Sequence, residues 1–292
     1  MSLEKIYKKA GAFASDCLNS CISILKIIIQ SRYNVKLPKA QQDTCIILGN
    51  GPSLAQSLVK HQDFLEKHSL MCVNGFALSA EYAVLKPAYY VLLDPVLWQD
   101  NNEHVKNMLD AIIRSTSWEL HLLIPQKGKN SAALKRIEKQ NSKIKIYYFN
   151  YTVFKGFSSL SHMLFARNMA MPQSQNVLVA SLFLSINMHF KTTFILGADH
   201  TWHENLHVNE SNQLCLKDVH FYDNGQKVNY RLFYKDASHS STFSMHEILY
   251  TLSKVFYGYN VLKKYASYRG TSIYNASEIS FIDVFERKKI GE

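Results

Sequence analysis

The chain has 292 residues, of which 47% are hydrophobic and 19% charged, and it carries a formal net charge of +10. This composition is globular, and the length allows one large α/β domain or two small ones. The positive charge suits an anionic partner, but no run of five basic residues occurs, so we expect no binding to nucleic acid. The five cysteines form no Cys-x-x-Cys pair, which favours free thiols and a cytoplasmic protein.

Residues 1–41 differ in composition from the rest of the chain. Residues 10–29 are mostly apolar, but Asp16, Asn19 and Lys26 interrupt them, which argues against a transmembrane helix. The long polar start has no small-residue cleavage site, which argues against a signal peptide. Two interpretations stay open. The segment is either a basic amphipathic helix lying on the anionic inner face of the cytoplasmic membrane, or a helix packed on its own domain or on a second subunit of a homo-oligomer.

Beyond residue 41, short apolar runs alternate with helical patterns. We expect strands at residues 45–48, 70–74, 89–93, 119–124, 143–149, 193–197 and 271–274, and helices at 76–85, 103–114, 132–140, 176–188, 244–266 and 277–287. Residues 150–175 have no clear period and are expected to be loop-rich. This alternation indicates one Rossmann-like α/β domain over residues 42–292, with an open, mostly parallel sheet and helices on both faces. Residues 198–242 are interpreted as a lid-like insertion.

The first strand runs directly into a tight polar turn, Gly49-Asn50-Gly51-Pro52-Ser53. Two glycines permit a sharp turn close to a ligand, Pro52 suits the first turn of a helix, and Ser53 can satisfy free amides there. A phosphate or a ribose would bind at such a strand end. The third glycine of the dinucleotide fingerprint is missing and no Gly-Lys-Ser/Thr occurs, so neither an NAD site nor a P-loop is indicated.

Polar residues stand at the carboxyl ends of several predicted strands, where ligands of an open parallel sheet collect. One such residue means little, because Asn and Asp favour turns, but several on one edge indicate a binding site. The candidates are Asn50, Asn74, Asp94, Asp199 and Asn275.

Residues 203–207, His-Glu-Asn-Leu-His, match the zinc-protease pattern His-Glu-x-x-His. Zinc would require His203 and His207 one turn apart on a stable helix, and residues 208–212 are poor helix formers. We therefore expect no metal site here. The chain also contains no Asp-x-Asp, the usual Mn²⁺ or Mg²⁺ clamp for nucleotide-sugar diphosphates.

The run Gly-Asn-Gly-Pro-Ser-Leu at 49–54 resembles the opening motif of the CMP-sialic-acid-dependent sialyltransferases of glycosyltransferase family 42, a motif shared with motility accessory factor and MptE-like proteins. Shorter matches extend over roughly residues 43–285. Residues 72–76 resemble the second motif, whose Asn corresponds to Asn74, and residues 194–199 resemble the late strand ending in Gly-x-Asp. Asp94 stands where the family has Asn. The family's arginine before the apolar helix has no counterpart in residues 172–176, where Asn176 is our candidate contact to the nucleotide.

The resemblance implies a GT-A-like variant of the Rossmann-like fold and an inverting glycosyl transfer. It implies that tyrosines of the lid-like region, Tyr222, Tyr230 and Tyr234, stabilise the leaving phosphate, and that a histidine takes the proton of the acceptor hydroxyl. That histidine corresponds either to His239 or to His246. The second lies near the start of a long helix, whose positive end favours the neutral imidazole that a base needs.

We therefore predict a metal-independent, inverting glycosyltransferase without a cofactor. It would transfer an acidic sugar, sialic acid-like or Kdo-like, from a CMP-activated donor to a bacterial surface glycan such as lipopolysaccharide or capsule. The alternatives are an MptE-like pterin pyrophosphokinase, which needs ATP and Mg²⁺, and a non-catalytic nucleotide-sugar-binding protein. The expected catalytic residues are His246, His239, Tyr222 and Tyr234, and the expected nucleotide-binding residues are Gly49, Asn50, Gly51, Pro52, Ser53, Asn74, Asp94, Asn176, Asp199 and Asn275.

Overall fold

The computed structural model describes residues 2–99, 102–216, 230–235 and 240–290. Its centre is a sheet of eight strands in the order β11-β10-β6-β1-β2-β3-β4-β5, and every neighbouring pair runs parallel. The prediction of an open, Rossmann-like parallel sheet is confirmed. The strands are β1 (Thr44–Leu48), β2 (Ser69–Val73), β3 (Tyr89–Val91), β4 (Leu120–Pro125), β5 (Ile144–Phe149), β6 (Thr192–Leu196), β10 (Ser272–Asn275) and β11 (Glu286–Arg287).

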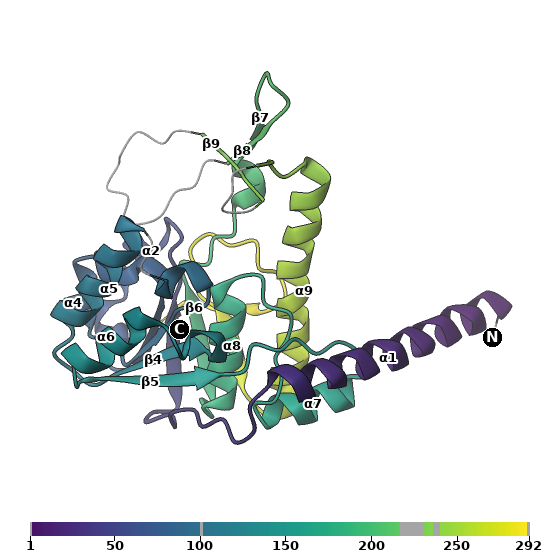
Figure 1. The fold of residues 1–292 in the computed structure, drawn as a ribbon, viewed down its shortest axis with the longest axis horizontal. Helices are drawn as coiled ribbons and strands as arrows, with labels where there is room; N and C mark the ends of the chain where they lie inside the picture. Colours follow the sequence, from purple (N-terminus) through teal and green to yellow (C-terminus); the bar gives the residue numbers. More distant parts are fainter. Residues whose placement is uncertain (1, 100–101, 217–229, 236–239, 291–292) are drawn as a thin grey trace.

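Helices cover both faces of this sheet (Figure 1). They are α2 (Leu54–Lys60), α3 (Gln62–Leu65), α4 (Glu81–Leu85), α5 (Glu103–Ser115), α6 (Ala132–Gln140), α7 (Ser158–Ala166), α8 (Val177–Asn187) and α9 (Met245–Arg269). Successive side chains of β1 alternate between the faces, as the pleat requires. Cys45 and Ile47 enter one core with α7, α8 and α9, whereas Ile46 and Leu48 enter a second core with α2 to α6.

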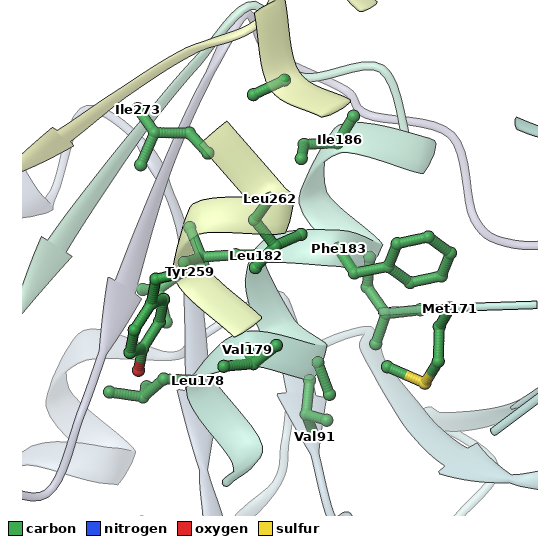
Figure 2. Packing of buried hydrophobic residues seen from close by; sticks show 14 of the residues in the cluster. Val91, Met171, Leu178, Val179, Leu182, Phe183, Ile186, Tyr259, Leu262 and Ile273 are labelled. Atoms are coloured by element: carbon green, nitrogen blue, oxygen red, sulfur yellow. The ribbon is translucent and has the colours of Figure 1, made fainter. Parts of the chain in front are cut away.

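Helix α8 is buried along almost its whole length, because it lies between the sheet and other helices. Figure 2 shows Val179 and Leu182 of this helix beside Tyr259 and Leu262 of α9, all four in the same core. A helix that is apolar all round is expected in such a position. This contact therefore fixes the start of α8 and the second half of α9 relative to the sheet.

Three sequence predictions need correction. Residues 150–175, predicted to be loop-rich, contain α7, and the predicted helix 76–85 is divided into a 3₁₀ turn (Asn74–Leu78) and α4. The predicted closing helix at 277–287 is wrong: this segment is irregular and ends in β11, which pairs with β10. One local and one long-range side-chain bond explain the loss of the helix: Asn275 Oδ1 accepts from the Ser277 amide at 3.2 Å, and Ser280 Oγ donates to the Ala198 carbonyl at 2.6 Å.

The predicted lid-like insertion, residues 198–242, contains a small antiparallel sheet. It consists of β7 (Leu206–Val208), β8 (Leu214–Leu216) and β9 (Arg231–Leu232), in that order. Figure 1 shows this sheet beyond one end of the main sheet, near the start of α9. Tyr222 and His239 lie outside the described residues.

The first helix, α1 (Leu3–Gln30), projects from the body of the protein (Figure 1). Its buried residues are Ser20, Ser23 and Ile27 alone, among the described ones. By length and composition this helix could cross a membrane, with a mean hydropathy of 1.6 over its best window, although an N-terminal signal sequence would pass the same test. The polar residues at 16, 19 and 26 thus interrupt the apolar run without interrupting the helix.

Candidate functional site

A cavity of about 580 Å³ opens at the carboxyl edge of the main sheet. The strand order places β1 between β6 and β2, so the chain reverses its winding direction between β1 and β6. Ligands of open α/β sheets bind outside the strand ends at such a switch point. The cavity is lined by the turns after β1, β2, β3 and β6, by the start of α8, by the small sheet and by one face of α9; the α9 residues are Ile248, Thr251, Leu252 and Val255.

The turn after β1 lies directly against the turn after β6. A Cβ on Gly49 would be 2.4 Å from the Gly197 carbonyl oxygen, and a Cβ on Gly51 would be 2.5 Å from Asp199 Oδ1. Gly197 itself has a left-handed φ of 63°, which favours glycine. The glycines are thus required by the contact between two strand ends. Of Gly49 and Gly51, only Gly51 also lines the cavity.

The carboxylate of Asp199 accepts two hydrogen bonds from Ser53. Its Oδ2 accepts from the Ser53 amide at 2.9 Å, and its Oδ1 accepts from the Ser53 hydroxyl at 2.5 Å. The sequence predicts that Ser53 caps α2 with its side chain, but the structure shows no such bond. A phosphate at this amide would also meet a carboxylate, so the phosphate of a nucleotide has to be held elsewhere in the cavity.

Two amide oxygens of the cavity lining are buried without a hydrogen-bond partner among the described residues: Oδ1 of Asn50 and Oδ1 of Asn74. The other end of Asn50 is fixed, since its Nδ2 donates to the Val73 carbonyl at 3.1 Å. Asn74 has a left-handed φ of 47°, a conformation that Asn tolerates better than most residues. A buried unsatisfied acceptor costs about 1–3 kcal/mol, which a ligand with N–H or O–H donors would remove.

A polar network closes one wall of the cavity. Asn176 begins α8, where its Oδ1 accepts from the Val179 amide at 2.9 Å, and its Nδ2 donates to Tyr259 Oη at 3.1 Å. Tyr259 Oη lies 2.6 Å from Nε2 of His200. When Tyr259 Oη accepts from Asn176 and donates to His200 Nε2, each of these two contacts has one donor. Nε2 then carries no proton, so the ring proton of His200 is on Nδ1.

His200 is held as a neutral imidazole. Burial lowers its pKa to about 3, and its ring stacks on Trp202 with centroids 4.3 Å apart. Its backbone has a left-handed φ of 57°, which indicates that the surrounding structure imposes this conformation. His200 can therefore orient Tyr259 and Asn176 across the working pH range, but it is too weak a base to hold a proton there.

Asp94 and Tyr151 also line the cavity. Asp94 is exposed and its Oδ1 accepts from the Val96 amide at 3.0 Å, so it begins the 3₁₀ turn Pro95–Trp98. Tyr151 donates to the Ser174 carbonyl at 2.5 Å. Burial and, less strongly, the charge of Asp94 raise the pKa of Tyr151, so its hydroxyl remains protonated.

The structure separates the residues nominated from the sequence into three groups. The cavity lining contains Asn50, Gly51, Pro52, Asn74, Asp94, Asn176 and Asp199. Gly49, Ser53 and Asn275 do not line it: Gly49 and Ser53 are sequence neighbours of lining residues, and Asn275 donates to the Ile282 carbonyl at 3.1 Å. Tyr234 and His246 also lie outside the lining. His246 is exposed, and it belongs to a different face of α9 from Ile248, Thr251, Leu252 and Val255.

The cavity lining also contains residues that were not nominated from the sequence, among them Tyr151, His200, Trp202 and Arg231. His200 follows Asp199 directly, so the strand-end rule that selected Asp199 could have selected it. Arg231 is the single cation of the described lining, and it is carried by β9 of the small sheet. Its position depends on that sheet, which no pattern in the sequence indicated.

The His-Glu-x-x-His segment does not form an α-helix. Residues 202–205 are a 3₁₀ turn and residues 206–208 are β7, so His203 and His207 belong to different elements. The ring of His203 packs against Phe281, and that of His207 against Tyr230. The geometry that a zinc protease requires is therefore absent from this segment.

The chain matches no protein-family model and none of the curated proteins. Among solved structures it is similar to the MAf glycosyltransferase from Magnetospirillum magneticum AMB-1, with 14% identity and a TM-score of 0.49 over 89% of this chain and 35% of that one. It is also similar to FabMG, described as a novel type of enoyl-acyl carrier protein reductase, with 10% identity and a TM-score of 0.20 over 86% and 64% of the two chains. The chain thus spans about a third of the length of the first structure. At these TM-scores neither likeness bears on activity.

Proposed function

We propose that this protein is a metal-independent, inverting glycosyltransferase that uses a CMP-activated acidic sugar, sialic acid-like or Kdo-like, to build a bacterial surface glycan. The observation that carries the proposal is the pair of unsatisfied amide oxygens, Asn50 Oδ1 and Asn74 Oδ1, in a cavity at the switch point of the sheet. A cytidine offers the donors they lack, in its amino group and its ribose hydroxyls.

The charges of the lining favour a donor with one phosphate. Asp94 and Asp199 contribute two carboxylates, while Arg231 is the single cation among the described lining residues. A nucleoside diphosphate sugar would add a second phosphate charge to this surface and would need a metal or further cations to offset it. CMP leaves as a phosphate monoester, for which Arg231 and the hydroxyl of Tyr222 are our proposed stabilising groups.

The proton of the acceptor hydroxyl requires a base other than His200, because His200 is bonded to Tyr259 and its pKa is lowered to about 3. We assign this role to His239 in preference to His246, since His246 is exposed outside the cavity lining. Changing His239 to Ala should reduce CMP release from the donor by about 10²- to 10⁴-fold, whereas His246→Ala is the matched substitution that should leave it near wild type.

The decisive test is a thermal-shift panel of CMP, CDP, UDP, GDP and ATP, each with Mg²⁺ and with EDTA. CMP should stabilise the fold by about 2.7 kcal/mol at a hundredfold excess over its dissociation constant, and EDTA should not reverse this. Stabilisation by ATP with Mg²⁺ and none by CMP would replace the proposal with the pterin pyrophosphokinase. CMP binding without release of CMP from any CMP-sugar, with any acceptor, would leave a non-catalytic binding protein.

A further inference from the structure

Helix α1 contacts the body of the protein through its polar face. Ser20 Oγ accepts from the Phe157 amide at 3.2 Å, and Ser23 Oγ both donates to the Lys155 carbonyl at 3.1 Å and accepts from the Lys155 amide at 3.0 Å. Gly156 packs so closely that a Cβ there would be 2.1 Å from Ser20 Oγ. Hydrogen bonds to serines therefore hold the helix on the body.

Most apolar residues of α1 are left exposed by this arrangement, although Ile27 is buried and Cys17 is half-buried. They repeat at alternating spacings of four and three, so they form one continuous row along the helix. We call this row the apolar stripe; it consists of Leu3, Tyr7, Ala10, Ala14, Cys17, Cys21, Ile24 and Ile28. Leu3 is 86% exposed and Ile28 59%. Ile6, Phe13, Leu18 and Leu25 flank the stripe and are exposed as well.

A second cavity, of about 820 Å³, begins at the last residue of α1 and extends over the ends of β4 and β5. Four cations line it, and none of the ion pairs found in the described part of the chain involves them. Among the described residues of its lining there is no carboxylate. We call it the basic pocket; its cations are Arg32, Lys36, Lys127 and Lys129, and its polar and aromatic residues include Asn34, Asn130, Tyr147 and Tyr148.

We propose that the apolar stripe and the basic pocket together dock the protein on an anionic phospholipid membrane, with a lipid phosphate headgroup in the basic pocket. Clustered lysines and arginines beside an apolar helix are the features that recognise such headgroups. The pocket and the helix are continuous at Gln30, so one membrane surface can engage both. This assigns the basic pocket a ligand class separate from that of the cavity at the switch point.

Helix α1 lies in the membrane interface and does not cross the bilayer. From Ser20 to Ile27 one side of the helix is fixed to the body, so lipid cannot surround that part. The remaining N-terminal stretch, Leu3–Asn19, spans about 26 Å at about 1.5 Å per residue, which is shorter than the apolar thickness of a bilayer, about 30 Å. A helix with one apolar face and lysines elsewhere is typical of interfacial binding.

A second copy of the chain is the weaker occupant of the stripe. In a coiled coil, charged residues flank the apolar seam and select the partner, whereas Ile6, Phe13, Leu18 and Leu25 flank it here. Two copies joined at this end would also bring two basic pockets towards each other, and like charges repel. A membrane with anionic lipids meets both the apolar and the cationic surface.

The test is co-sedimentation of the full chain with vesicles of phosphatidylcholine alone and of phosphatidylcholine mixed with phosphatidylglycerol. We expect binding to the mixed vesicles only. Lys127→Gln with Lys129→Gln should weaken it about 25-fold, at about fivefold per cation, while Lys263→Gln with Lys264→Gln on α9 serves as the charge-matched control. Leu25→Ser with Ile28→Ser should weaken it at least about tenfold, against Val59→Ser with Val84→Ser, which are also exposed.

Sedimentation velocity without vesicles completes the test. A dimer that Leu25→Ser with Ile28→Ser converts to a monomer, together with no vesicle binding, would overturn the proposal in favour of a second copy. Equal binding of the wild type and the Lys127 and Lys129 variant to mixed vesicles would overturn the headgroup assignment, as would inorganic phosphate binding in the basic pocket without any effect of lipid composition. None of these readouts depends on CMP, so the proposed glycosyl transfer can fail or succeed separately.

Discussion

Asn50 has an amide group with one half bonded and the other half unsatisfied. Its Nδ2 holds the end of β2 through the Val73 carbonyl, and its Oδ1 is buried at the cavity without a described partner. If a nucleoside donor satisfies this oxygen, Asn50→Ala should weaken CMP binding by about 5- to 100-fold, corresponding to about 1–3 kcal/mol. Calorimetric titration measures this directly. Asn260→Ala, on the exposed side of α9, is the control, and an unchanged dissociation constant for Asn50→Ala would exclude the contact.

His200 makes the stability of the fold depend on pH. Because burial lowers its pKa from 6.5 to about 3, the unfolded chain binds more protons between these values, and unfolding becomes easier as the pH falls through this window. From about pH 7.5 to about pH 5 the loss is about 2 kcal/mol. Urea unfolding at both pH values should show this loss in the wild type and a smaller one in His200→Gln. His104→Gln, at an exposed site, should behave as the wild type does.

The turn between β1 and α2 connects two neighbouring strand ends, so its glycines set the geometry of the whole cavity edge. A Cβ at Gly51 would be 2.5 Å from Asp199 Oδ1 and 2.7 Å from the Gly197 carbonyl. Backbone atoms cannot move away cheaply, so Gly51→Ala should lower the free energy of unfolding by about 1–3 kcal/mol and disturb the Asp199–Ser53 contact. Gly11→Ala is the matched control, because a Cβ at Gly11 meets nothing within 4 Å. Equal stability of the two variants would mean that this turn can relax.

The elements of the main sheet could be predicted from the sequence because continuous apolar runs such as Cys45–Leu48 form strands buried on both faces. The strand-end candidates followed, since parallel strands bring their carboxyl ends to one edge. Residues 277–287 could not be predicted, because their conformation depends on bonds from Ser280 to the distant Ala198 carbonyl. Helix α7 was missed for a similar reason: its sequence has weak amphipathic periodicity, and tertiary packing of Phe165 in the core stabilises it.

Within the site, the sequence selected the residues that the strand ends carry and missed those that other elements bring in. His200 acquires its burial from Tyr259, which is 59 positions away on α9, and its lowered pKa follows from that burial. His246 was selected for its place at a helix start, where the capping box of Ser244 and Glu247 indeed forms. A position at a helix start defines the local backbone, but it does not determine whether the side chain faces a cavity.

At the scale of the whole molecule, the two cavities described above differ in their chemistry. The cavity at the switch point has unsatisfied amide acceptors and two carboxylates, and the basic pocket has four cations. Their described linings share no residue. The proposed nucleotide-sugar site and the proposed membrane-docking site can therefore be altered separately, as the proposed use of a water-soluble donor at a membrane requires.

The contacts of the N-terminal segment determine how much of it can be removed without affecting the body of the protein. The hydrogen bonds of Lys5, Lys8 and Ser15 stay within α1 and its N-cap, whereas the chain from Ser31 to Ala40 makes several bonds to the body. Ser31 Oγ donates to Thr152 Oγ1 at 2.8 Å, and the Ala40 amide donates to the Met188 carbonyl at 3.0 Å. A boundary after residue 41 suits the composition of the sequence, but a cut there removes contacts of the body.

Deleting residues 2–18 should therefore leave one cooperative urea transition and an unchanged affinity for CMP, because none of these residues lines the cavity at the switch point. Deleting residues 2–41 also removes buried Ile27 and the bonds of Ser31 and Ala40, so it should cost at least about 3 kcal/mol of the free energy of unfolding. Urea unfolding of both deletions, followed by titration with CMP, compares them. Equal stability of the two would show that residues 19–41 contribute nothing to the body, and a loss of CMP binding in the shorter deletion would mean that α1 acts on the nucleotide site.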